Sequence, residues 1–214
     1  MTPEVADAMG CEPFGRITGF RHNGDPISGP RCGPTTLILA GWPVEVETGP
    51  YDLMSLLRGA PVVEGLIGLT AFIGDTVTVD WAANQLIVES PESFRTRITG
   101  TRPLQVRPSR QGGGAFLDLF VRVVAARGDL WLEMDSGNTG PVLLSPHAAR
   151  QLGVELSPSE PRPVLLQFAG FGPVEVMALE RETIYDGLLN AAFHAAHSVT
   201  LDLARMRAWM RERG

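Results

Sequence analysis

The side chains best suited to chemistry lie in the triplet Asp135-Ser136-Gly137, inside an otherwise apolar stretch. A carboxylate can take up or release a proton for a reacting group when the chain holds it beside the substrate. The same three residue types also favour ordinary turns, since Asp and Ser bond to the nearby backbone and Gly adopts left-handed conformations. The triplet alone is therefore a weak signal, and its setting has to be considered.

Apolar strands are expected on both sides of this triplet. Residues 130–134 (Leu-Trp-Leu-Glu-Met) predict a strand that runs directly into Asp135, and residues 142–144 predict a second strand after it. A short helix is expected over residues 147–152, because Gly153 follows and Gly commonly ends helices. The sequence thus predicts a carboxylate at a turn between two buried strands.

The composition indicates a folded, mostly β protein. The 214 residues include 24 Gly and 17 Pro with 44% hydrophobic residues, and long helical patterns are few. Net charge is −6, and all 18 basic residues are Arg without a basic cluster, so nucleic acid is not an expected partner. No apolar run reaches the roughly 18 residues of a membrane span. The first residues lack a signal-peptide pattern, and this leaves the compartment open, export included.

The chain has two cysteines, Cys11 and Cys32. A disulfide between them is one interpretation, and two reduced, partly buried thiols are the other. Their spacing resembles no metal site.

The chain is expected to divide into three parts: an N-terminal lobe over 1–92, a linker over 93–114 and a C-terminal lobe over 115–214. The linker is predicted from its polar, Gly- and Pro-rich composition. The N-terminal lobe begins with a helix over 2–10 and carries a hairpin over 15–29, with Asn23-Gly24 at its tip. One or two helical turns over 51–57 are also expected.

An internal repeat connects the two halves of the chain. Three pairs of segments match in the same order: 2–10 with 145–153, 64–67 with 186–189, and 78–82 with 200–204. The offset is 143 residues for the first pair and 122 for the other two. The first half is therefore 21 residues longer, and we assign the extra length to the hairpin over 15–29.

A strand, an Asp-Ser-Gly turn, a second strand and a short helix, present in a duplicated chain, resemble the retropepsin-like and pepsin-like aspartic proteases. The resemblance implies an all-β, two-lobed fold built from two β-barrels, with short helices and a hairpin flap on the first lobe. Leu66-Ile67-Gly68 matches the family's apolar-apolar-Gly strand, whereas Leu188-Leu189-Asn190 departs at the Gly. The implied activity is peptide hydrolysis by a water that two aspartates activate, with a peptide or protein substrate and no cofactor.

By the same resemblance, Asp135 is a catalytic carboxylate, Ser136 braces the turn through its hydroxyl, and Gly137 allows close approach of the backbone. Asn138 stands where the family has a small residue, which weakens the expected support of Asp135. Arg21, His22 and Asn23 at the hairpin tip are candidate substrate contacts, although solvated polar side chains are common there.

The second aspartate of the dyad is not among these residues, since no other Asp-Ser/Thr-Gly triplet occurs. The repeat offset places its expected position upstream of Met1, so the first lobe is expected to be incomplete at its N-terminus. Three alternatives follow: a second Asp upstream, a homodimer in which Asp135 meets its twin, or a non-catalytic peptide-binding or scaffolding relative.

Other chemistry has less support. His147, His194 and His197 lack an accompanying cluster of carboxylates or thiols, so no metal is expected. Ser136 lacks the Gly-x-Ser-x-Gly pattern of a nucleophilic serine. Asp80 and Asp202 occupy equivalent places in the repeat, which favours a structural role for both.

Overall fold

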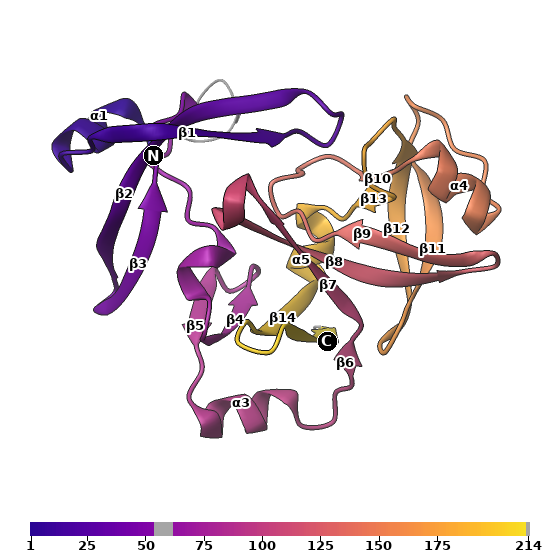
Figure 1. The fold of residues 1–214 in the computed structure, drawn as a ribbon. Coiled ribbons are helices and arrows are strands. Elements are labelled where there is room, and N and C mark those ends of the chain that lie inside the picture. Colours follow the sequence, from indigo (N-terminus) through magenta and orange to yellow (C-terminus); the bar gives the residue numbers. More distant parts are fainter. Residues whose placement is uncertain (54–61, 213–214) are drawn as a thin grey trace. The chain divides into compact units, whose positions relative to one another are not determined.

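The computed structural model describes residues 1–53 and 62–212, and these residues are predominantly β strands with short helices (Figure 1). The prediction of an all-β chain with short helices is confirmed. The described residues include no helix long and apolar enough to cross a membrane. Most of the helical turns expected over 51–57 lie outside the described part.

Contacts divide the chain into two compact units. The first unit holds residues 1–72 and 110–117, and the second holds 73–109 and 118–214. This division differs from the lobes and linker expected from composition. Strands from residues 76–88 pair with the last strands of the chain, and the expected linker over 93–114 contains regular structure.

The first unit is built on a three-stranded antiparallel sheet in the order β1-β2-β3. Its elements are α1 (Pro3–Ala8), β1 (Pro13–Phe20), β2 (Pro26–Leu39), β3 (Trp42–Thr48), η1 (Leu69–Phe72) and η2 (Gly112–Gly114). Strands β1 and β2 form the predicted hairpin, with Asn23-Gly24 in the turn between them. Its strands extend beyond the expected bounds, because β2 continues to pair with β3.

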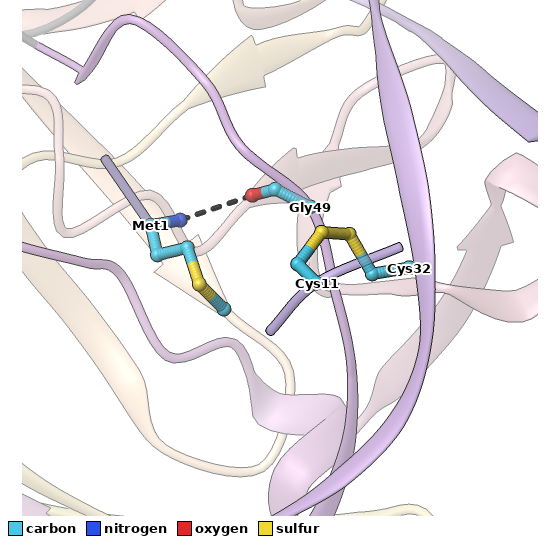
Figure 2. The surroundings of a disulfide bond; sticks show 4 residues. All are labelled: Met1, Cys11, Cys32 and Gly49. Atoms are coloured by element: carbon cyan, nitrogen blue, oxygen red, sulfur yellow. Dashed lines mark hydrogen bonds between the residues drawn. A yellow bond between two sulfur atoms is a disulfide. The ribbon is translucent and has the colours of Figure 1, made fainter. Parts of the chain in front are cut away.

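A disulfide joins Cys11, just after α1, to Cys32 on β2, and their Cα atoms lie 5.6 Å apart. This settles the two alternatives for the cysteines in favour of the disulfide. Beside it, the ammonium group of Met1 donates a hydrogen bond of 3.2 Å to the carbonyl of Gly49 (Figure 2). The chain is thus attached to the sheet region on both sides of helix α1, by the hydrogen bond from Met1 before the helix and by the disulfide of Cys11 after it.

The second unit contains a closed barrel. Its six strands are β8 (Phe116–Ala125), β9 (Gly128–Glu133), β13 (Gly187–Leu188), β10 (Val142–Leu144), β12 (Gly172–Glu180) and β11 (Arg162–Phe168), and β11 pairs with β8 to close it. Strand β7 (Val106–Gln111) extends the sheet beside β8. Helices α4 (Pro146–Leu152) and α5 (Ala191–Ala196) follow β10 and β13. Alternate residues of β9, Leu130 and Leu132, are buried, as expected for one inward-facing side of a strand.

A five-stranded sheet completes the second unit, in the order β5-β4-β14-β15-β6. The strands are β4 (Thr76–Asp80), β5 (Gln85–Val88), β6 (Pro103–Leu104), β14 (His197–Asp202) and β15 (Arg207–Glu212), with α3 (Pro91–Ile98) between β5 and β6. Strand β4 pairs antiparallel with β14, and Thr78 lies opposite Thr200. These two residues are equivalent in the repeat, so an approximate two-fold axis relates the hairpins β4–β5 and β14–β15.

The repeat is also visible in matching backbone hydrogen bonds. The amide of Thr2, the N-cap of α1, donates to the carbonyl of Glu64 at 2.8 Å. The amide of Ser145, the N-cap of α4, donates to the carbonyl of Asp186 at 2.9 Å. The matched sequence segments therefore form the same local structure in each half.

The two repeated aspartates have equivalent structural roles. Asp80 Oδ1 accepts from the amide of Ala83, and Asp202 Oδ1 accepts from the amide of Arg205, both at 2.9 Å. Each carboxylate stabilises the turn of its own hairpin. Asp202 is fully buried and also forms ion pairs of 3.3 Å with Arg205 and Arg207.

Candidate active site

Strand β9 carries Asp135 to the edge of the barrel. The pairing with β8 sets Glu133 opposite Phe120, and it continues for one more residue because the amide of Met134 donates to the carbonyl of Leu119 at 2.8 Å. Side chains alternate along an extended chain, so Glu133 and Asp135 lie on the outer face of the sheet, opposite the buried Leu132. Asp135 itself is half-buried.

The carboxylate of Asp135 is held by the turn that follows it. Its Oδ1 accepts a hydrogen bond of 2.8 Å from the amide of Gly137. A Cβ atom at position 137 would lie 3.1 Å from the same oxygen, so Gly gives the carboxylate the room it needs there. The hydroxyl of Ser136 makes no hydrogen bond within the described residues. The bracing expected of Ser136 therefore comes from other groups in this turn.

Asn138 supplies this bracing. Its side-chain amide donates to the carbonyls of Pro141 at 3.0 Å and Leu189 at 3.5 Å, and its Oδ1 accepts from the amide of Gly140 at 3.1 Å. Its own carbonyl accepts from the amide of Ala191 at 2.8 Å. The expected weakness at this position is thus wrong, because a larger amide side chain ties the turn to the segment after β13.

Asn190 explains the other departure from the family pattern, where Gly was expected. Its Oδ1 accepts from the amide of Phe193 at 2.9 Å and so caps α5. Its side-chain amide donates to the carbonyl of Gly140 at 2.7 Å. Asn138 and Asn190 therefore form two reciprocal connections between the Asp135 turn and the start of α5.

Two further carboxyl groups, those of Asp118 and Glu133, lie near Asp135, and no local sequence pattern predicted them. Asp118 lies two residues before Phe120 on β8 and on the same face, and the continued register sets it opposite Asp135. Burial, and then the charges of Asp118 and Asp135, raise the pKa of Glu133 to about 8. Glu133 is therefore mostly protonated at neutral pH and adds little negative charge beside Asp135.

The remaining candidates belong to other elements of the chain. Arg21, His22 and Asn23 are in the β1–β2 turn of the first unit, where the Asn23 amide donates to the carboxylate of Asp25 at 2.7 Å. His194 and His197 are buried with their rings against Phe193, as expected from packing. No group of three or more His, Cys, Asp or Glu side chains in the described part is arranged to hold a metal ion.

Comparison with solved structures finds a similarity to a retropepsin-like aspartic protease from Rickettsia conorii. The TM-score is 0.31 and the identity is 11%, over 52% of this chain and 98% of that chain. No family model matches the sequence, and no curated protein matches it. A similarity of this degree establishes neither family nor activity, which have to be argued from the site.

Proposed function

We propose that the chain is an aspartic-type endopeptidase in which Asp135 is one of two carboxylates that activate a water molecule. The observation that carries this proposal is the fixed, half-buried carboxylate at a strand end, with one oxygen held by the Gly137 amide. This bond orients the carboxylate and leaves its other oxygen for a water or a partner carboxyl group.

The reaction needs a second carboxyl group close to the first. Two such groups at hydrogen-bond distance share one proton, so the charged member can accept a proton from water while the neutral member polarises the peptide carbonyl. Water then attacks the carbonyl carbon, and the nitrogen leaves as an amine after it is protonated. No cofactor is required. The second group would come from another Asp-Ser/Thr-Gly turn, either in a second copy of the chain or in a further segment of the protein.

A non-catalytic peptide-binding or scaffolding role is the second candidate. The observation that favours it is that these 214 residues contain a single Asp-Ser/Thr-Gly triplet. The fold would then present an extended peptide to the outer face of the barrel without hydrolysing it.

The test compares the native protein with Asp135→Asn, using Asp129→Asn at the other end of β9 as the matched control. Unstructured protein substrates are incubated from pH 3 to pH 7, and new amino termini are quantified. We expect hydrolysis by the native protein and the control, inhibition by statine-containing peptides, and loss of hydrolysis in Asp135→Asn.

Hydrolysis that persists in Asp135→Asn would contradict the proposal. Peptide binding without hydrolysis by the native protein would favour the second candidate. The source of the second carboxyl group is found by measuring the rate of hydrolysis per protein molecule at several protein concentrations. A dyad shared between two copies requires a dimer, so this rate should rise with protein concentration, whereas a dyad within one polypeptide gives a constant rate.

A further inference from the structure

The second unit has a pocket of about 670 Å³ on the outer face of β8 and β9. Phe120 and Trp131 contribute from these strands, Arg107 from β7, Arg150 from α4, and Tyr185 from the segment before β13. The rings of Phe120 and Tyr185 meet edge to face, with their centroids 5.0 Å apart. The pocket therefore combines an aromatic lining with two guanidinium groups from different elements.

The two guanidinium groups are available to a ligand. Arg107 lies over the indole ring of Trp131, with its Cζ 4.2 Å from the ring centroid, and this contact orients the group without using its N–H donors. Neither Arg107 nor Arg150 forms an ion pair with any carboxylate in the described part of the chain. Arginine donors in this state favour a carboxylate, which can accept two parallel hydrogen bonds from one guanidinium.

Two carboxylates also line the pocket and have to be taken into account. Asp186 Oδ2 accepts from the backbone amide of Trp131 at 2.8 Å, so part of its hydrogen-bonding capacity is used inside the protein. Glu182, Arg107 and Arg150 are all exposed to solvent, which screens their charges equally, so recognition depends on the paired N–H donors of the guanidinium groups. A ligand carboxylate that approaches Arg107 and Arg150 thus meets two unpaired cations.

The pocket and Asp135 lie on one face of the same sheet. Phe120 is directly opposite Glu133, two residues before Asp135. Trp131 precedes Asp135 by four residues on the same side of the extended chain, which corresponds to about 13 Å at roughly 3.3 Å per residue. An extended peptide covers that distance with about four residues.

We propose that this pocket binds the carboxylate of an acidic residue in an extended peptide, about four residues from the peptide bond placed at Asp135. The inference rests on the proposed function for the position of that bond. It names the substrate class as peptides that carry Asp or Glu at one position remote from the cleavage site.

The test measures binding and hydrolysis separately. A set of eight-residue peptides carries a single Glu at each position in turn, and a matched set carries Gln. Affinities are measured by fluorescence polarisation with the Asp135→Asn protein, which should not cleave them. At one position we expect the Glu peptide to bind about tenfold more tightly than its Gln counterpart, as for a charge-assisted hydrogen-bonded pair.

Arg107→Gln and Arg150→Gln should each reduce this preference toward unity, and Arg150→Glu should reverse it in favour of a Lys peptide. Arg162→Gln, on β11 and outside the pocket, is the matched control and should keep the preference. Arg150 is exposed on a helix, so its variants test the proposal even if Arg107→Gln folds poorly.

Equal affinity for the Glu and Gln peptides at every position, or no binding of any acidic peptide, would overturn the proposal. A preference that survives both Arg→Gln changes would also overturn it. Acid-selective binding without hydrolysis by the native protein would support the pocket and reject the peptidase. Hydrolysis without acid selectivity would support the peptidase and reject the pocket.

Discussion

The hydroxyl oxygens of Thr78 and Thr200 lie 2.8 Å apart, both fully or almost fully buried, at the centre of the five-stranded sheet. Thr78 also donates to the buried carboxylate of Glu89 at 2.6 Å. The two threonines occupy equivalent positions of the repeat but have unequal roles, because Glu89 bonds to Thr78 alone of the two. Symmetry of the backbone is therefore accompanied by asymmetry of the polar contacts.

This asymmetry predicts unequal costs for the same substitution. Thr78→Val should lower the free energy of unfolding more than Thr200→Val, because it removes a donor from buried Glu89 as well as the contact between the hydroxyls. We expect about 1–3 kcal/mol for Thr78→Val and less for Thr200→Val. Urea denaturation of both variants checks this, and equal losses would show that the Glu89 bond contributes little.

Asn138 should be more important for the Asp135 turn than Ser136. Asn138→Ala removes the three side-chain hydrogen bonds to Gly140, Pro141 and Leu189, and we expect it to cost about 1–3 kcal/mol. Thr139→Ala, at the exposed neighbouring position, serves as the control and should be nearly neutral. Denaturant unfolding gives the stabilities. A larger loss for Ser136→Ala than for Asn138→Ala would contradict this assignment.

Glu133 should make stability depend on pH. Its pKa is raised from 4.5 to about 8 in the folded protein, so the folded state retains a proton that the unfolded chain releases. The stabilisation is complete below pH 4.5 and is lost as the pH rises toward 8. Glu133→Gln should flatten this part of the profile, as followed by thermal unfolding, whereas Glu175→Gln on β12 should leave it unchanged. A native profile that is already flat over this range would refute the assignment.

His194 should give stability the opposite pH dependence to Glu133, with a loss as the pH falls. Burial, and then the charge of His197, lower the pKa of His194 from 6.5 to about 4, and its Nε2 has no partner within the described residues. The contribution of neutral His194 is complete above pH 6.5 and is lost as the pH falls toward 4. His194→Gln should reduce the acid sensitivity of unfolding, and His22→Gln, in the exposed hairpin turn, should not. If His194→Gln loses stability at acidic pH as the native protein does, groups other than His194 cause the acid sensitivity.

The disulfide should stabilise the first unit selectively. That unit has a small set of buried apolar side chains, and the bond between Cys11 and Cys32 closes a loop over a sequence separation of 21 residues. A loop of this size corresponds to about 3 kcal/mol of stabilisation. Hydrogen exchange of the double variant Cys11→Ala/Cys32→Ala should therefore show faster exchange in residues 1–48 and little change in the barrel. A uniform increase would mean that the two units unfold together.

Local signals in the sequence predicted local structure well. Gly153, as a helix end, and the Asn23-Gly24 turn predicted the helix over 147–152 and the hairpin, because these features depend on neighbours in sequence. The repeat also indicated which distant segments are equivalent. It could not indicate that the two equivalent hairpins pair with each other, since strand register over long separations leaves no local pattern.

The candidate site shows the same limit. Asp135 was predictable because a turn triplet between apolar runs is visible in the sequence. Glu133 and Asp118 come together with it only through the pairing of β8 with β9, and Arg107 meets Trp131 through a further strand. Asn138 looked unfavourable in sequence. Its partners Gly140 and Pro141 are close in sequence, but the carbonyl of Leu189 and the amide of Ala191 become its neighbours only after β13 is in place.

The pairing of β4 with β14 sets Thr78 opposite Thr200, and these two residues are 122 positions apart in the chain. During synthesis, β4 and β5 leave the ribosome long before β14, so the edge of β4 that pairs with β14 remains unpaired until β14 has been made. Contacts of such long sequence separation form slowly, because a large loop must close before they contribute any stability. An unpaired strand edge is also a site at which other chains can add. The step that completes this sheet is therefore where productive folding competes most directly with aggregation of the nascent protein.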